Sequence, residues 1–266
     1  MTTSPDSPIL SIVMPVRNEG INLKIMLKIL RAVVDATHEV IVVYDSEGDD
    51  SVPVVESMMP GYPELRLILN TRGRGVLNAL SAGIASARGK YVLIFAAAEV
   101  GPVLAIDDML ALLDEGCDFV SCTRYAHGGR RLGGSWIGGK LSRAANRWFC
   151  RLSGLGLTDA TTGIKMFRRE VFAMLDLQAR PIGWAVTFEM AIKAQLAGLA
   201  LGEVPIVSID RLYGGKSTFV LGPWFAEYLR WFLWGLKGSW RQPAGSRRPT
   251  QVRIPSATAM GGKVAM

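Results

Sequence analysis

The chain has 266 residues, 49% of them hydrophobic, and 30 Lys and Arg against 23 Asp and Glu leave a net charge of +7. This composition excludes a disordered protein, because disordered chains are poor in apolar residues. No uninterrupted apolar run reaches the ~18 residues of a membrane-spanning helix. The three cysteines are too few, and odd in number, for a disulfide framework. They indicate a reducing compartment, and the polar N-terminus predicts no secretory signal.

Short apolar runs alternate with segments of helical period through the first half of the chain, which is typical of βαβ units. Strands are expected at Ile9 to Val16, His38 to Asp45, Leu65 to Asn70, Tyr91 to Ala97 and Asp118 to Tyr125, and helices near Asn18, Pro53, Gly75 and Val103. Because most of these strands are apolar on both faces, they favour a parallel sheet. The predicted fold class is therefore α/β.

Six glycines between residues 128 and 139 predict a mobile loop. Further elements are expected as a helix from Lys140 to Leu152, a strand from Ile164 to Arg168, a helix from Trp184 to Ala197 and a strand from Ala200 to Ile209. Residues 1–220 are therefore expected to form one globular domain.

Polar residues follow the first two predicted strands, in the segments Pro15 to Glu19 and Tyr44 to Asp50. In a doubly wound sheet, ligands bind outside the carboxyl ends of the strands, so these residues are well placed to hold a nucleotide. Asp45 and Asp49 are equally compatible with plain turn and cap positions. The segment after the third strand contains Arg72 and Arg74, which would suit a phosphate, but Asn78 replaces the last glycine of a dinucleotide fingerprint.

The joint order of several motifs across residues 9–220 resembles glycosyltransferase family 2, which has the GT-A fold, and within it the dolichol-phosphate mannose synthases and bacterial polyprenyl-phosphate glycosyltransferases. The motifs are Pro15-x-Arg17-Asn18-Glu19, Asp45 to Asp49, Asn70-x-x-Gly73, Thr123-Arg124-Tyr125, Asp159-Ala-Thr-Thr-Gly163, Glu203-Val-Pro205 and Arg211-x-x-Gly214-Gly-Lys216. The resemblance implies inverting transfer of a sugar from a GDP- or UDP-linked donor to a polyprenyl phosphate. Such an acceptor is already an anion, so positioning and charge neutralisation do most of the catalysis.

The resemblance also implies roles for individual residues. The base and ribose of the nucleotide would be held by Pro15, Arg17, Glu19 and Asp45, with Asp49 or Asp50 close by. Arg72 and Gly73, after the third strand, are further candidate substrate-binding residues. At the reacting atoms, Arg124 and Ser142 would face the acceptor phosphate, helped by Arg130 or Arg131 of the glycine-rich loop, while Asp159 and Thr162 would line the sugar pocket. Arg211 and Lys216 would reach the donor diphosphate.

The chain departs from the family at the metal site. The family carries Mg²⁺ or Mn²⁺ on an Asp-x-Asp motif after the fourth strand, where this chain has Phe95-Ala96-Ala97-Ala98-Glu99. Alanine cannot ligate a metal, so only Glu99 remains as a ligand, and we expect reduced metal binding. Three interpretations stay open: a natural branch that uses Glu99, a member without turnover, and an engineered substitution.

Residues 221–240 form an aromatic segment with four of the seven tryptophans, and they predict a helix that lies on an anionic membrane surface. A core or dimer-interface helix is the alternative, which leaves a homo-oligomer open. Four cations spaced along the predicted helix after residue 139, namely Lys140, Arg143, Arg147 and Arg151, support a membrane surface. From Lys237 onward there are six cations and no acid, so residues 241–266 predict a flexible basic tail. We therefore expect a cytoplasmic protein peripherally associated with the membrane.

Two rival functions remain within the family. One is a glycosyltransferase with a soluble or glycan acceptor, for which Asp159 or Glu189 would be the general base. The other is a nucleotide-sugar-binding protein without turnover, which the alanines at 96–98 motivate. Nucleic-acid binding is suggested by the sequence pI of about 9.5 alone, and no recognition motif supports it.

Overall fold

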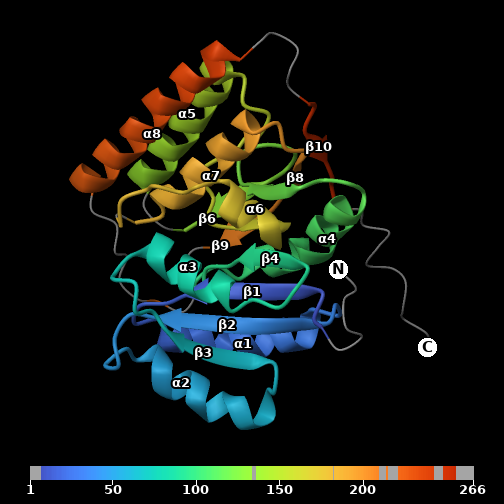
Figure 1. Ribbon diagram of the computed structural model, residues 1–266, viewed down its shortest axis with the longest axis vertical. Coiled ribbons are helices and arrows are strands. Elements are labelled where there is room, and N and C mark those ends of the chain that lie inside the picture. The colour runs from blue at the N-terminus through green and yellow to red at the C-terminus, as the bar shows by residue number, and fades with distance from the viewer. Residues whose placement is uncertain are drawn as a thin grey trace.

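The computed structural model of the protein describes residues 7–133, 136–181, 183–209, 214, 221–242 and 248–255. An eight-stranded sheet runs through the molecule, and helices pack on both of its faces (Figure 1). Its strands are β1 (Leu10–Pro15), β2 (His38–Tyr44), β3 (Leu65–Leu69), β4 (Tyr91–Ile94), β5 (Phe119–Thr123), β7 (Lys165–Arg168), β8 (Leu201–Pro205) and β10 (Gln251–Val252). The spatial order is β10-β8-β5-β7-β4-β1-β2-β3. Only β7 is antiparallel to its neighbours, so the predicted α/β class with a mostly parallel sheet is confirmed.

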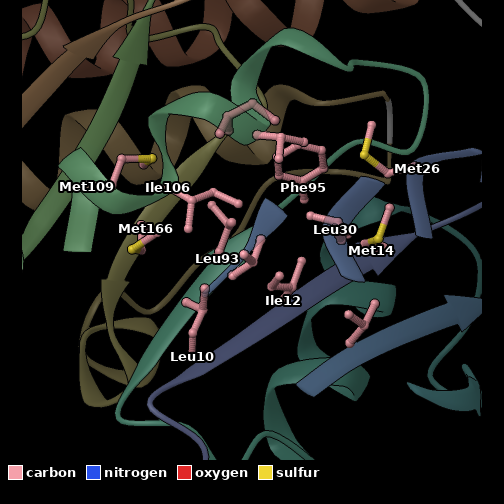
Figure 2. Close-up of a cluster of buried hydrophobic side chains, with 14 of the residues drawn as sticks. Leu10, Ile12, Met14, Met26, Leu30, Leu93, Phe95, Ile106, Met109 and Met166 are labelled. Atoms are coloured by element: carbon pink, nitrogen blue, oxygen red, sulfur yellow. The ribbon is translucent and has the colours of Figure 1, made fainter. Parts of the chain in front are cut away.

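The helices are distributed over the two faces of the sheet. They are α1 (Gly20–Val33), α2 (Ser51–Met58), α3 (Val76–Ala85), α4 (Ile106–Asp114), α5 (Trp136–Ser153), α6 (Arg169–Met174), α7 (Ala185–Leu196) and α8 (Leu221–Arg241), with short 3₁₀ helices η1 (Met59–Gly61) and η2 (Gly101–Ala105). One buried cluster joins the sheet to α1, α2 and α4, and Figure 2 shows its centre, where Ile12, Leu93 and Phe95 lie together. A second cluster joins the other face to α3, α5, α6, α7 and α8.

Close packing of α3 fixes the edge of the sheet where β1 and β2 end. A β-carbon on Gly83 would lie 2.6 Å from Val13 Cγ1 and 2.8 Å from Val43 Cγ2, so a larger side chain would push the helix away. The small residues that the sequence places along this helix therefore let it lie directly on the strands. This contact positions the loop before α3 beside the ends of β1 and β2.

Three segments differ from their predictions. The strand expected from Ala200 to Ile209 is divided into β8 and β9 (Val207–Ile209), which belong to different sheets. The glycine-rich loop contains a strand, β6 (Arg130–Leu132), which pairs in parallel with β9 (Val207–Ile209) as a separate two-stranded sheet. The tail predicted to be flexible contains β10, which pairs with β8, and Arg253 forms ion pairs with Asp108 and Glu115 of the α4 region. Strands β6 and β10 are short and form only through pairing with residues distant in the sequence, so local composition does not reveal them.

The aromatic segment forms α8, which lies beside α5 and packs on α7 (Figure 1). Trp231 and Leu236 are buried in this contact, whereas Phe225, Leu233 and Trp240 are exposed. Among the described residues, no helix combines the length and the apolar character that crossing a bilayer requires.

Candidate active site

A small cavity of about 140 Å³ lies where β1 and β2 end. It is lined by Arg17, Asn18, Asp45, Ser46, Gly48, Asp49 and Arg74. Three of these, Arg17, Asp45 and Asp49, are predicted nucleotide-binding residues, so the structure brings the residues after the first two strands together as expected. Two arginines at one small cavity suit an anionic ligand.

Asp49 holds the frame of this cavity. Its carboxylate is 5% exposed and accepts hydrogen bonds from the backbone N–H of Asn18, at 3.1 Å to each oxygen, and of Ser51, at 2.8 Å. Asn18 has φ 53°, a left-handed conformation that asparagine tolerates better than most residues. Asp49 therefore joins the turn after β1 to the start of α2, which fits the turn alternative, while the N-cap position of α2 is occupied by Asp50.

Asp45 is tied to the loop between β3 and α3. Its Oδ1 accepts a hydrogen bond from Asn70 Nδ2 at 2.7 Å, and Asn70 Nδ2 also donates to the Gly73 carbonyl at 2.7 Å. Gly73 and Gly75 have φ of 96° and 121°, which only glycine adopts without strain. This backbone path places Arg74 on the small cavity, whereas Arg72 lines a separate groove between α3 and α6.

A buried ion pair joins Arg124, which directly follows β5, to Asp159, which lies in the loop before β7. The Arg124 guanidinium donates to both carboxylate oxygens of Asp159, from Nε at 2.7 Å and from Nη2 at 3.0 Å. Arg124 is 8% exposed and Asp159 is fully buried. Burial would raise the pKa of Asp159, but the charge and hydrogen bonds of Arg124 outweigh it and hold that pKa below its usual value. Both residues are therefore charged.

Helix α5 supplies the rest of this polar cluster. Asn146 is buried, and its Nδ2 donates to Thr161 Oγ1 at 2.9 Å while its Oδ1 accepts from the Ala160 N–H at 2.9 Å. Ser142, one turn earlier, hydrogen-bonds Thr161 Oγ1 at 3.0 Å. The predicted reaction-centre residues Arg124, Ser142 and Asp159 are thus brought into one hydrogen-bonded network with Thr161.

Two further charged residues lie beneath the network. Lys165 is fully buried, its Nζ lies 2.7 Å from Ser121 Oγ, and burial lowers its pKa to about 8. Glu203 is fully buried and accepts from the Thr158 N–H at 2.7 Å and from Thr158 Oγ1 at 2.8 Å. Burial raises the pKa of Glu203 to about 7. His127 Nε2 lies 4.0 Å from its carboxylate.

The remaining predicted site residues lie in several places. Pro15 ends β1, Glu19 precedes α1 and accepts a hydrogen bond from Asn22, and Thr162 is fully buried. Arg131 is half-buried on β6. Arg211 and Lys216 lie outside the described residues. The binding and catalytic roles of all these residues stay predictions.

Sequence analysis did not select Asn18, Asn146 or Thr161 as site residues. Asn18 is part of the quoted motif Pro15 to Glu19, and Asn146 lies four residues after Ser142. Their hydrogen-bond partners, Asp49 and the Ala160 N–H, are distant in the sequence, so the sequence does not predict these contacts. Thr161 lies within the quoted motif Asp159-Ala-Thr-Thr-Gly163, but the motif does not show that Thr161, rather than Thr162, contacts Arg124.

The residues present do not fit a resident divalent ion. Ala96, Ala97 and Ala98 follow β4, and the Glu99 carboxylate accepts a hydrogen bond from Ser208 Oγ at 3.1 Å. In the part of the chain that the structure describes, no three His, Cys, Asp or Glu side chains gather as a metal-binding group. Mg²⁺ and Mn²⁺ prefer several oxygen ligands, which this set does not supply.

The family model described as "Glycosyl transferase family 2" matches residues 11–175. The chain belongs to this family. The resemblance found in the motif order is therefore confirmed, and this glycosyltransferase has the enzyme class that its sequence predicted.

Two curated relatives are similar to this glycosyltransferase. A polyprenol monophosphomannose synthase of Mycolicibacterium smegmatis is 27% identical over 76% of this chain and 78% of the relative. A dolichol-phosphate mannosyltransferase of Pyrococcus furiosus is 25% identical over 83% of this chain, which spans 61% of that relative.

Solved structures share the fold. Glucosyl-3-phosphoglycerate synthase of Mycobacterium tuberculosis, in complex with Mn²⁺, UDP and glucosyl-3-phosphoglycerate, superimposes with a TM-score of 0.64 at 17% identity, over 90% of this chain and 82% of that one. The same enzyme with Mg²⁺ and UDP gives a TM-score of 0.66 at 18% identity, over the same shares of the two chains. Divalent metals thus occur with this fold.

The buried ion pair generates a first prediction. Asp159→Asn should lower the free energy of unfolding by about 3–5 kcal/mol, because it leaves the Arg124 charge buried without a partner. Urea unfolding measures this loss. The double variant Arg124→Gln/Asp159→Asn should lose much less than the sum of the two single variants, and an additive result would show that the pair is not coupled.

Glu203 generates a prediction on pH. Because burial holds the pKa of Glu203 at about 7, above its usual 4.5, the folded state binds more protons than the unfolded state between these two values. The stability that Glu203 contributes is therefore fully present below pH 4.5, is lost as the pH rises to about 7, and does not change further above the folded-state pKa. Glu203→Gln cannot ionise at this position. Its free energy of unfolding should therefore rise relative to that of the wild type, by up to about 1.4 kcal/mol per pH unit between the two pKa values.

Urea unfolding at pH 5, 6, 7 and 8 measures this difference. Glu64→Gln, at an exposed site, is the matched control, and the difference between its free energy of unfolding and that of the wild type should not change with pH. A constant difference between Glu203→Gln and the wild type would contradict the prediction.

Proposed function

We propose that this glycosyltransferase transfers a sugar, with inversion, from a nucleotide diphosphate sugar to a polyprenyl phosphate at a membrane surface. The names of the two curated relatives support this acceptor class. The observation that carries the proposal is the double role of α5, which contributes to the polar network on one side and to an exposed apolar surface on the other.

The inner side of α5 faces the site. Ser142 and Asn146 hydrogen-bond Thr161, whose Oγ1 also accepts from Arg124 at 3.1 Å. The network therefore places a cation and hydroxyl groups beside α5. These groups suit the phosphate of an acceptor that approaches along this helix.

The outer side of α5 continues onto α8. Trp240 Nε1 of α8 donates to the Leu152 carbonyl of α5 at 2.9 Å, so the two helices are joined at their C-terminal ends. The large exposed apolar side chains of the pair form what we call the α5–α8 surface: Leu141, Trp148, Leu152, Phe225, Leu229, Leu233, Trp234 and Trp240.

Cations border the α5–α8 surface. Lys140, Arg143, Arg147 and Arg151 are exposed on α5, and Lys237 and Arg241 are exposed on α8. Apolar side chains bordered by Lys and Arg are typical of helices at the headgroup boundary of an anionic bilayer. An acceptor with a lipid tail in that bilayer and a phosphate at its surface would meet the network beside α5. We therefore place the protein on the cytoplasmic membrane surface as a peripheral protein.

The chemistry requires little of a general base. An acceptor phosphate oxygen attacks the anomeric carbon of the sugar, the bond from that carbon to the donor diphosphate breaks, and the nucleoside diphosphate leaves with the electron pair. Attack from the face opposite the leaving group gives inversion. Because the acceptor is an anion at neutral pH, the protein mainly needs to orient the two substrates and balance their charge. The cavity with Arg17 and Arg74 is the proposed nucleotide site.

The proposed reaction predicts transfer to lipid phosphate. The purified protein, incubated with GDP- and UDP-linked hexoses and a short polyprenyl phosphate in detergent, should yield a glycosylated lipid detected by mass spectrometry. 3-Phosphoglycerate and free sugars are the soluble acceptors for comparison. Product on a soluble acceptor alone would replace the proposal with the rival acceptor class, and donor binding without product on any acceptor would support a protein without turnover.

The α5–α8 surface predicts membrane binding. The double variant Trp148→Ser/Trp240→Ser removes two exposed aromatic side chains and should weaken binding to anionic vesicles about tenfold or more, because their burial in the headgroup region is lost. Co-sedimentation measures this loss. Met174→Ser on α6 removes an apolar side chain that is 56% exposed elsewhere, and should bind as the wild type does. Equal binding of all three proteins would contradict the proposed surface.

A further inference from the structure

The turn after β4 is built so that it lies beside the end of β1 without offering metal ligands. Phe95 N–H donates to the Val13 carbonyl at 3.0 Å, so the chain still follows β1 at this point. Glu99 N–H then donates to the Ala96 carbonyl at 3.1 Å and closes a turn over the alanines. Ala97 is buried, and Ala96 and Ala98 are half-buried. At the two half-buried positions of this turn, the chain therefore presents methyl groups, which cannot ligate a cation.

The one carboxylate of this turn is directed to β9. Glu99 Oε2 accepts a hydrogen bond from Ser208 Oγ, and Ser208 is 1% exposed. Even if Glu99 also contacted an ion, a single carboxylate would supply at most two of the roughly six oxygen ligands of Mg²⁺ or Mn²⁺.

Arg131 is placed beside the same turn by the small sheet. In the parallel register of β6 and β9, Arg131 is the partner of Ser208, so the two side chains leave the same face. Arg131 Nη1 lies 3.3 Å from the point that a β-carbon of Gly139 would occupy. The arginine thus extends from the Ser208–Glu99 contact towards the first turns of α5, where a glycine leaves it room.

We propose that this enzyme binds the donor diphosphate without a divalent ion held by its own side chains, and that Arg131 supplies a positive charge to that diphosphate rather than to the acceptor phosphate, the role that the family resemblance implied. This inference rests on the proposed nucleotide-sugar donor. A guanidinium offers two parallel N–H donors that match a phosphate, and its charge is fixed at all relevant pH values. It can therefore stabilise the negative charge that develops on the leaving diphosphate.

Calorimetry of UDP and GDP binding tests the inference without turnover. The better of the two nucleotides should bind the wild type with the same Kd, within about twofold, in EDTA and in Mn²⁺. Arg131→Ala should weaken binding by about 10- to 100-fold, which corresponds to one charge-assisted hydrogen-bonded contact. Lys28→Ala is the control: it removes one positive charge from an exposed position of α1 that has no proposed role in binding, and should bind as the wild type does.

A repaired metal motif gives a second measurement. Ala96→Asp/Ala98→Asp should bind the nucleotide more tightly in Mn²⁺ than in EDTA. Adding these two changes to Arg131→Ala should restore binding in Mn²⁺ only. Circular dichroism of each variant checks that it is folded.

Three results would overturn the inference: tenfold weaker binding of the wild type in EDTA, unchanged binding by Arg131→Ala, or binding of neither nucleotide under any condition. The proposed acceptor fails separately. If the nucleotide binds with the expected Arg131 dependence but polyprenyl phosphate is not glycosylated, the acceptor is wrong and the inference on the donor stands.

Discussion

The buried ion pair of Arg124 and Asp159 is the constraint on which the position of α5 depends. Two charges removed from water cost several kcal/mol each unless they are paired with good geometry and their other hydrogen bonds are satisfied. The bidentate contact meets the first condition, and Thr161 and Asn146 meet the second. Since Asn146 belongs to α5, satisfying the pair also fixes that helix against the sheet. The direction of its outer face, and so of the α5–α8 surface, follows from a polar contact in the interior.

The small cavity at the ends of β1 and β2 is also shaped by hydrogen-bonded carboxylates. Asp49 accepts backbone N–H groups of two segments, and Asp45 accepts the side chain of Asn70. The carboxylates at the ends of the strands thus shape the backbone, whereas the arginines at the small cavity are exposed to it. In this cavity the carboxylates of Asp45 and Asp49 are hydrogen-bonded to the protein, whereas Arg17 and Arg74 are exposed. Such an arrangement suits an anionic ligand. Both substrates of the proposed reaction carry phosphate.

Sequence patterns predicted the parts of the fold that depend on local composition. The apolar runs identified the long strands, and the polar residues after β1 and β2 identified a cavity wall, because strand ends in such a sheet lie together. The sequence did not predict that Arg74, rather than Arg72, lines the small cavity, since this depends on the backbone conformation of Gly73 and Gly75. Nor was the Arg124 contact with Asp159, which joins residues 35 apart in the sequence. The short strands β6 and β10 exist only through their non-local partners.

The small sheet of β6 and β9 would help Arg131 to bind a phosphate, because it orders the loop that carries this arginine. A cation on a mobile glycine-rich loop would lose conformational freedom each time it bound a phosphate, and that entropy would subtract from its affinity. Pairing with β9 orders the loop before any ligand arrives and sets Arg131 at the position of Ser208. The same pairing holds Ser208 against Glu99, so the turn without metal ligands and the ordered arginine are linked by one strand. In the proposed donor site, the absent Asp-x-Asp motif and the ordered loop that carries Arg131 would therefore be related features, rather than independent departures from the family pattern.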